Sequence, residues 1–127
     1  MNHMKKILIA FVALVLLFPS AYAQKKGAKN YVVGFYNLEN LFDTYNDPAK
    51  NDEEFLPEGK NKWTDVKYQK KLTNMAKVIK SMKEANGAWH ALLGVSEIEN
   101  RLVLEDLVMD PQIAEANYQI VHYDGPD

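Results

Sequence analysis

The sequence contains no cysteine among its 127 residues. This absence excludes disulfide bonds, thiolate metal sites and a cysteine nucleophile. It also excludes a lipid-anchored lipoprotein, because no cysteine follows the apolar segment near the N-terminus to carry the lipid. Metal binding or catalysis by this chain therefore depends on side chains other than thiols.

A net positive charge is also lacking, since the formal charge at pH 7 is −2. All seventeen acidic residues lie beyond residue 23, whereas two of the fifteen basic ones, Lys5 and Lys6, precede it. Residues 24–127 therefore carry thirteen basic and seventeen acidic side chains, a net charge of −4. This balance argues against a broad basic surface that holds nucleic acid by neutralising phosphates, so such binding would be limited to a confined site.

The first 23 residues have the pattern of a secretory signal peptide. Lys5 and Lys6 precede an apolar run over 7–18, and small residues at the −3 and −1 positions favour cleavage before Gln24. An uncleaved membrane anchor is the alternative, but the run is shorter than the roughly 20 residues that a spanning helix requires. We therefore expect export to the periplasm or secretion, a flexible leader over 24–30, and no stable membrane anchor after cleavage.

Beyond the leader, hydrophobic patterning predicts alternating strands and helices. Runs rich in β-branched, aromatic or continuous apolar residues indicate strands, and apolar residues at helical spacing indicate helices. The predicted elements are a strand over 31–37, a turn of helix over 38–43, a long polar loop over 44–62, a helix over 64–87, a strand over 91–95, a helix over 101–110 and a strand over 117–124. Strands separated by helices favour an α/β layer architecture.

The two longer predicted helices each present one apolar face. These faces consist of Tyr68, Leu72, Met75, Ala76, Ile79 and Met82 in the first helix and of Leu104, Leu107 and Val108 in the second. We expect Thr64 or Asp65 to cap the start of the first helix, and Asn86 and Gly87 to end it. Its methionines have core spacing, so we interpret them as packing residues rather than as a cofactor site.

Two of the predicted strands carry a further signal. Gly34 lies inside the first strand, where a glycine indicates a close backbone approach or a β-bulge. The run over 91–95 is continuously small and apolar, which predicts a strand buried on both faces.

An amide and a carboxylate mark the ends of these strands. Asn37 closes the strand over 31–37, and Glu97 comes two residues after the strand over 91–95. If the strands are parallel neighbours, both side chains reach the carboxyl edge of the sheet, where ligands bind in α/β folds. A glutamate there is a hard oxygen donor suited to Mg²⁺ or Mn²⁺, and an asparagine offers a carbonyl or an N–H without adding negative charge. Solvated loop residues are the alternative interpretation.

The segments "VVGFYNLENLF" and "LLGVSEIEN" resemble the endonuclease/exonuclease/phosphatase superfamily, which includes deoxyribonuclease-type nucleases, abasic-site endonucleases, sphingomyelinases and inositol polyphosphate phosphatases. The resemblance covers residues 31–127 and looks like that of exported bacterial members. It implies an α/β (α+β) fold, with this chain as the N-terminal half of a four-layer α/β/β/α sandwich. By position, Asn37 matches the family's first-strand active-site asparagine and Glu97 its metal-binding glutamate. Both are therefore candidate catalytic and metal-binding residues, for Mg²⁺ or alternatively Mn²⁺.

Four further polar residues lie close to these two motifs. Glu39 and Asn40 follow the first motif residue and are either part of the site or polar residues of a helical turn. Glu99 and Asn100 follow the second and are either outer or substrate-facing residues of the site or ordinary loop residues.

The resemblance also implies catalytic groups that residues 31–127 do not supply. Family members use a histidine with an aspartate partner, an Asp-x-Asn pair and a terminal Asp-His, all from the second half of the domain. His90 would face the opposite edge of the sheet, His122 lies within a predicted strand, and His3 belongs to the signal peptide. We therefore expect the C-terminal half of the domain to be absent and this chain to be inactive alone.

The sequence thus predicts an exported, divalent-metal-dependent phosphoesterase whose substrate is a nucleic acid, a phospholipid head group or a sugar phosphate. The loop over 44–62 would shape substrate entry, and Trp63 at its end is expected to be a packing anchor. The alternative is a small exported binding or interaction protein without catalysis, whose carboxylates are only solvated. The sequence does not indicate an oligomeric state.

Overall fold

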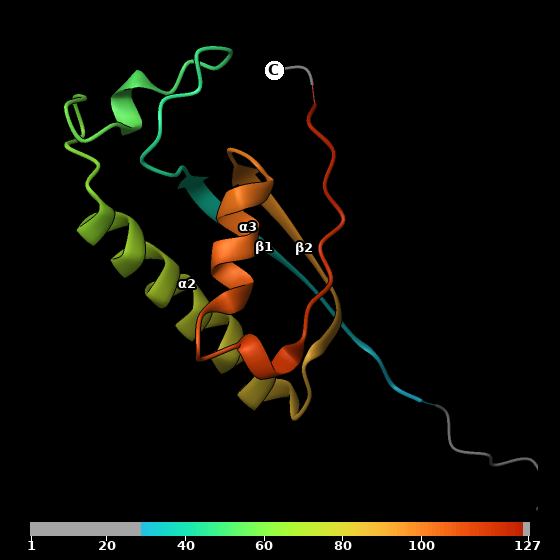
Figure 1. Cartoon of the computed structure of the whole chain (residues 1–127). Helices are drawn as coiled ribbons and strands as arrows, with labels where there is room; N and C mark the ends of the chain where they lie inside the picture. The colour runs from blue at the N-terminus through green and yellow to red at the C-terminus, as the bar shows by residue number, and fades with distance from the viewer. Residues whose placement is uncertain (1–28, 126–127) are drawn as a thin grey trace, which may run out of the picture. The chain divides into compact units, whose positions relative to one another are not determined.

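Two parallel strands and two helices carry the fold in the computed structural model, which describes residues 29–125 (Figure 1). Along the chain the elements are strand β1 (Val32–Leu41), the 3-10 helix η2 (Glu53–Phe55), helix α2 (Asp65–Asn86), strand β2 (His90–Ile98), helix α3 (Arg101–Met109) and the 3-10 helix η3 (Ala114–Ala116). The expected signal peptide and most of the leader lie outside the described residues. A parallel sheet with helical connections gives the α/β class that the sequence predicts.

Strands β1 and β2 are parallel, and helix α2 makes the crossover between them. The register pairs Val32 with His90 and Asn37 with Ser96, so the two strands end at the same edge. A β-carbon at Gly34 would lie only 2.7 Å from Cδ2 of His90, which is closer than a real side chain tolerates. The close contact at Gly34 is with the side chain of His90, not with another backbone as the sequence had suggested, and the glycine lets the His90 ring pack against β1.

Helices α2 and α3 pack on the same face of the sheet (Figure 1). Their apolar stripes meet side chains from β1, and the buried core consists of Leu38, Leu41, Tyr68, Leu72, Met75, Ala76, Ile79, Val103, Leu104, Leu107 and Ile113. Full burial of one large apolar side chain contributes roughly 1.5–3 kcal/mol. This one layer of contacts therefore holds both helices against the sheet.

Helix α2 forms as predicted. Thr64 stands at the N-cap position, but its side chain makes no capping hydrogen bond. Gly87 follows the last residue in the left-handed conformation, with φ at 72°, as a C-terminal glycine does. Of its six predicted core residues, five are buried and Met82 is partly buried. Although α2 has 22 residues, no helix among residues 29–125 is both long and apolar enough to cross a membrane.

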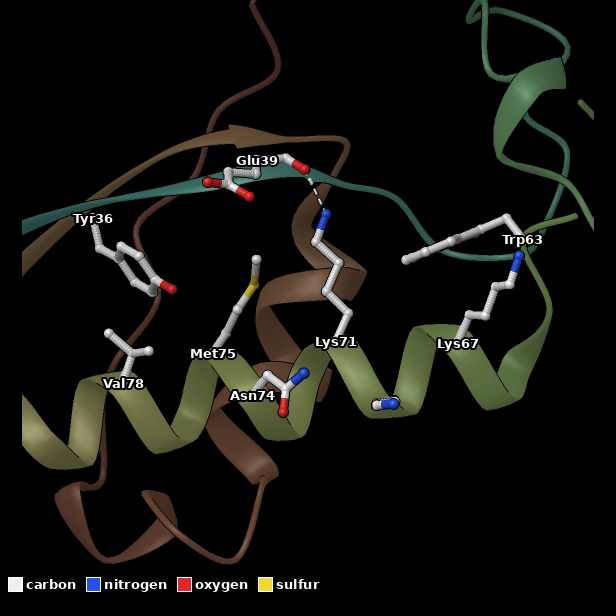
Figure 2. A pocket seen from close by; sticks show the side chains of 9 residues that line it. Tyr36, Glu39, Trp63, Lys67, Lys71, Asn74, Met75 and Val78 are labelled. Atoms are coloured by element: carbon white, nitrogen blue, oxygen red, sulfur yellow. Dashed lines mark hydrogen bonds between the residues drawn. The ribbon is translucent and has the colours of Figure 1, made fainter. Parts of the chain in front are cut away.

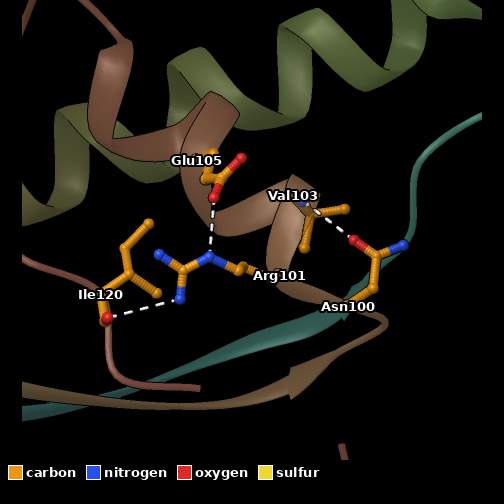
Figure 3. Close-up of polar contacts among 5 residues, drawn as sticks. All are labelled: Asn100, Arg101, Val103, Glu105 and Ile120. Carbon is orange, nitrogen blue, oxygen red and sulfur yellow. Dashed lines mark hydrogen bonds and ion pairs between the residues drawn. The ribbon is translucent and has the colours of Figure 1, made fainter. Parts of the chain in front are cut away.

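Helix α3 begins at a side-chain cap. Oδ1 of Asn100 accepts a hydrogen bond of 3.1 Å from the backbone N–H of Val103 (Figure 3). Leu104 and Leu107 are buried as predicted, and Val108 is partly buried. Val103, which the sequence analysis did not select, is fully buried beneath the cap. The helical spacing therefore predicted the buried face of α3 correctly, except that it omitted Val103.

The predicted turn of helix over 38–43 is wrong, because β1 continues to Leu41. Leu38 and Leu41 are both fully buried, and the strand keeps these two side chains in the core. Glu39 and Asn40 between them have positive φ values, so the strand is interrupted by a bulge rather than ended by a helix.

The strand predicted over 117–124 does not form. Tyr118 and Ile120 do pack against the core, so the alternation of burial is as expected. These residues have no ladder partner in the described part of the chain, and a strand requires one. The segment is held by Arg101 instead, whose Nη1 donates to the carbonyl of Ile120 at 3.4 Å while its Nε pairs with Glu105 at 2.7 Å (Figure 3).

The face of the sheet opposite the helices is exposed in residues 29–125. Its large apolar side chains are Tyr31, Val33, Phe35 and Leu92, which are 64–69% exposed. The prediction that β2 is buried on both faces is therefore wrong for the described chain. An apolar run indicates a surface suited to burial, but burial also requires an element that covers it, and none of the described elements does.

Candidate active site

Asn37 and Glu97 meet near the carboxyl ends of the two strands. The prediction that Asn37 closes its strand is wrong, because β1 continues to Leu41. Nδ2 of Asn37 donates a hydrogen bond of 2.7 Å to Oε1 of Glu97. Oδ1 of Asn37 accepts one of 2.6 Å from the backbone N–H of Glu39. Because a backbone N–H needs an acceptor and a carboxylate needs a donor, these two partners fix the orientation of the amide. The expectation that both side chains reach one edge of a parallel sheet is confirmed.

The backbone around this pair is irregular. After Asn37 pairs with Ser96, the ladder resumes only at Leu41 and Ile98. We call the unpaired residues Leu38, Glu39 and Asn40 the β1 bulge; they lie opposite the single residue Glu97. Glu39, Asn40 and Glu97 all have left-handed backbones, with φ at 49°, 58° and 56°.

Left-handed backbones at residues with a β-carbon cost roughly 1–3 kcal/mol each and persist where the surroundings enforce them. Such residues occur often at functional sites. The unfavourable backbone conformations therefore occur at the position where Glu97 presents its carboxylate to solvent.

Behind this edge, Glu99 and Asn100 form a polar network with Asp43. Oε2 of Glu99 accepts from the backbone N–H of Asp43 at 3.0 Å, and Nδ2 of Asn100 donates to Oδ2 of Asp43 at 3.0 Å. The backbone N–H of Glu99 donates to the carbonyl of Leu41 at 3.0 Å. Glu99 and Asn100 are loop residues between β2 and α3, as one of the two interpretations holds, but they are not simply solvated, because Glu99 is buried and Asn100 caps α3.

Burial raises the pKa of Glu99, and the nearby negative charges of Asp43 and Asp52 raise it further. The hydrogen bond from Asp43 and the charge of Lys50 act in the opposite direction. Among the described residues, Oε1 of Glu99 and Oδ1 of Asp52 are buried carboxylate oxygens without a hydrogen-bond partner. Glu99 is therefore a buried carboxylate at the junction of β2 and α3, with one oxygen bonded to Asp43 and the other without a partner.

The loop over 44–62 is folded onto the end of β1. Phe55 stacks on Phe42 with the ring centroids 4.1 Å apart, and Trp63 meets the Phe55 ring edge-on. Nε1 of Trp63 donates to the carbonyl of Phe42 at 3.0 Å. Trp63 thus has the contacts of the packing anchor that the sequence predicts.

Neither described histidine makes a hydrogen bond with Asn37 or Glu97. His90 is buried at the start of β2, with Nδ1 3.3 Å from the hydroxyl oxygen of Tyr118. His122 belongs to the irregular segment after η3. His90 therefore lies at the edge of the sheet opposite to Glu97, as the sequence analysis expected.

The donor set at this edge fits a hard divalent cation in part. Glu97 is an exposed carboxylate with one oxygen oriented by Asn37, and its Oε2 makes no hydrogen bond within residues 29–125. Mg²⁺ takes one or two protein carboxylates and fills its shell with water and phosphate oxygens. In the described residues no three histidine, aspartate or glutamate side chains group as a metal site. One carboxylate and its orienting amide are what this part of the chain offers.

Two residues around this edge were missed by the sequence analysis. Asp43 was taken as part of a helical turn, and only its burial reveals its role in the network. Lys71 was not selected as a candidate, yet its ammonium group contacts the β1 bulge. Its spacing of three residues from Tyr68 and four from Met75 places it on the buried side of α2, which was the available signal.

Comparison with known proteins gives one match. The family model described as "Endonuclease/Exonuclease/phosphatase family" matches residues 32–127. No curated protein and no solved structure matches the chain. The matched segment contains both Asn37 and Glu97.

Proposed function

The chain belongs to the endonuclease/exonuclease/phosphatase family, and we propose that it carries the metal-binding edge of a divalent-metal-dependent phosphoesterase. The family name covers nucleases and phosphatases, which hydrolyse phosphate esters. A phosphate ester is therefore the substrate class. This class includes nucleic acids, phospholipid head groups and sugar phosphates.

The observation that carries the proposal is the hydrogen bond between Asn37 and Glu97. A metal-binding carboxylate is effective when a neighbouring donor fixes its orientation. Asn37 supplies that donor to Oε1 and leaves Oε2 open toward solvent. The left-handed backbone of Glu97 supports the same interpretation, because this conformation is rarely kept without a functional or packing reason.

In the proposed mechanism Glu97 holds Mg²⁺ or Mn²⁺, and Asn37 keeps the carboxylate in place. The bound cation would neutralise the negative charge that develops on the phosphate during hydrolysis. The amide of Asn37 is engaged at both ends. It would therefore orient Glu97.

The proposal includes groups beyond residues 29–125. An imidazole from a second half of the domain would act as general base on the attacking water, as the resemblance implies. This chain would then be inactive alone. Export through the segment over 1–23 is part of the same proposal.

Binding of Mn²⁺ tests the metal site directly. Electron paramagnetic resonance would follow titration of Mn²⁺ into the full chain, into Glu97→Gln and into Glu84→Gln. Glu84 is an exposed glutamate on α2 that makes no hydrogen bond or ion pair within residues 29–125, so it is a matched control. We expect Glu97→Gln to weaken binding by at least about tenfold and Glu84→Gln to leave it unchanged. Equal affinities in all three chains, or no binding by the wild type, would refute the metal site.

A non-catalytic interaction protein is the second candidate, and the exposed apolar face of the sheet favours it. Val33, Phe35 and Leu92 lie together there, and contiguous exposed apolar side chains often mark binding surfaces. This function predicts self-association that Phe35→Ser weakens and that Mn²⁺ does not change. Sedimentation of both chains with and without Mn²⁺ would distinguish the two candidates.

A further inference from the structure

We infer that Lys71, on helix α2, is a positioning residue for the candidate metal site. Its ammonium group holds the β1 bulge in the shape that brings Asn37 to Glu97. The consequence for metal binding rests on the proposed function, whereas the support of the bulge can be measured without a metal.

The contacts of Lys71 are with the backbone of the bulge. Its Nζ donates to the carbonyl oxygen of Glu39 at 2.5 Å and to that of Asn40 at 2.8 Å; Figure 2 shows the first of these. Neither residue has a pairing partner in β2. An ammonium group carries three donors, so one side chain can serve both carbonyls. Lys71 therefore joins α2 directly to the irregular end of β1.

The bulge depends on such support because its backbone is unfavourable. Glu39 and Asn40 are consecutive left-handed residues, and neither is a glycine. The backbone N–H of Glu39 donates to Oδ1 of Asn37, so the conformation of Glu39 decides where the Asn37 amide points. Releasing the two carbonyls would let the bulge relax, and the bond from Asn37 to Glu97 would then be lost.

The surroundings of Lys71 hold its ammonium group in a fixed position. Burial lowers the pKa of Lys71, while the carboxylates of Glu39 and Glu97 act in the opposite direction. Its Nζ also lies 5.5 Å from the centroid of the Trp63 ring, within the range of a cation–π contact. The side chain is therefore held from both sides, by the ring and by the bulge.

Lys71 also lines a groove of about 430 Å³ between α2 and β1 (Figure 2). Lys67 in the same groove donates to the carbonyl of Asn61 at 2.8 Å, so two of its ammonium groups already bind main-chain oxygens. The carboxylate of Glu39 also faces the groove and would repel an anion. We therefore assign Lys71 to the support of the bulge rather than to a ligand.

Lys71 could affect cation binding through its charge or by positioning the site, and these two roles predict opposite effects of its removal. If Lys71 acted only through its charge, its removal would strengthen cation binding at Glu97, because a nearby like charge would be gone. If Lys71 positions the site, its removal should weaken cation binding by about 10–100-fold, as loss of residues that support metal ligands does. Whether cation binding becomes stronger or weaker therefore distinguishes the two roles.

Titration of Mn²⁺ followed by electron paramagnetic resonance, with the full chain, Lys71→Met and Lys70→Met, measures the direction of this change. Lys70 is the neighbouring lysine of the same groove, is exposed and makes no hydrogen bond within residues 29–125. Its variant removes the same charge without touching the bulge. We expect Lys71→Met to raise the Kd for Mn²⁺ at least about tenfold and Lys70→Met to change it little. An unchanged or lower Kd in Lys71→Met would overturn the inference.

Nuclear magnetic resonance without metal separates this inference from the proposed function. The side-chain amide of Asn37 should exchange its protons more slowly than that of the exposed Asn74, and Lys71→Met should abolish the difference. An Asn37 amide unaffected by Lys71→Met would overturn the role of Lys71 even if the wild type binds Mn²⁺. Absence of Mn²⁺ binding by the wild type would overturn only the proposed function.

The wild-type chain alone provides a last check, which does not depend on the folding of a variant. The ammonium protons of Lys71 should exchange with water more slowly than those of Lys70. Equal exchange rates would show that the ammonium group is not held by the bulge, and the inference would fail.

Discussion

The side-chain amide of Asn37 donates a hydrogen bond of 2.7 Å to Oε1 of Glu97, a residue sixty positions later in the chain. Each residue lies near the carboxyl end of its strand, beside the interruption of the ladder, and the parallel register brings both to one edge. This pair is the smallest unit of the candidate site, and its geometry depends on the bulge and the helix around it.

Asn37→Ala removes the donor that orients Glu97. We expect the Kd of the chain for Mn²⁺ to rise about 10–100-fold, because the carboxylate is then free to rotate. Isothermal titration calorimetry would measure the change, and Asn74→Ala on the exposed side of α2 is the control. If both variants bind Mn²⁺ as the wild type does, Asn37 does not orient the ligand.

Gly34→Ala should destabilise the chain, because the new β-carbon would lie 2.7 Å from Cδ2 and 2.9 Å from Nε2 of His90. We expect a loss of roughly 1–3 kcal/mol in the free energy of unfolding, as for other overpacked positions. Urea denaturation would measure it. Gly125→Ala, where a β-carbon meets nothing within 4 Å, is the control.

The same clash gives a double-mutant test. In the background of His90→Ala, the substitution Gly34→Ala should cost much less, because the obstructing ring is absent. An equal cost in both backgrounds would mean that the backbone, rather than the His90 ring, requires glycine at this position.

Asn100→Ala removes two interactions at once. The backbone N–H of Val103 loses its cap at the start of α3, and Asp43 loses a donor. Loss of a helix cap alone costs about 1 kcal/mol, so we expect a total of roughly 1–2 kcal/mol by urea denaturation. Asn86→Ala, at the exposed end of α2, should cost less; a comparable loss there would contradict the special role of Asn100.

Glu99→Gln should change how stability depends on pH. The folded chain has a raised pKa at Glu99, so it binds that proton more tightly than the unfolded chain does. Glu99 therefore lowers stability progressively as the pH rises from the unfolded pKa of about 4.3 through the folded pKa. Glutamine cannot ionise, so the stability of Glu99→Gln relative to wild type should improve over this window. Urea denaturation at a series of pH values would reveal it, and parallel curves for the two chains would contradict the prediction.

The local sequence pattern was sufficient to predict helices α2 and α3 and the edge of the sheet that carries Asn37 and Glu97. Helix α2 has an apolar stripe, an N-cap residue and a terminal glycine, and these three signals agree. The edge followed from one topological rule, since parallel neighbours in a sheet end on the same side. Neither deduction required knowledge of a distant contact.

The errors arose where distant contacts decide the structure. The segment over 117–124 has a strand's alternation but lacks a neighbour to pair with, and pairing is not encoded in the segment itself. The polarity of Glu39 and Asn40 suggested a helical turn, whereas the burial of Leu38 and Leu41 kept the chain in the sheet. Glu99 was open to interpretation as a solvated residue, because carboxylates usually are solvated. In the structure it is bonded to the backbone of Asp43, a residue much earlier in the chain.

The parallel register of β1 and β2 also determines when the candidate site can exist during folding. Strand partners lie about sixty residues apart, so the chain must close a long loop before the first ladder bond forms, and this closure is entropically costly. Helix α2 consists of local contacts and can form earlier. The meeting of Asn37 with Glu97 is therefore a late event, and a cation that needs both residues can recognise only chains that have already folded.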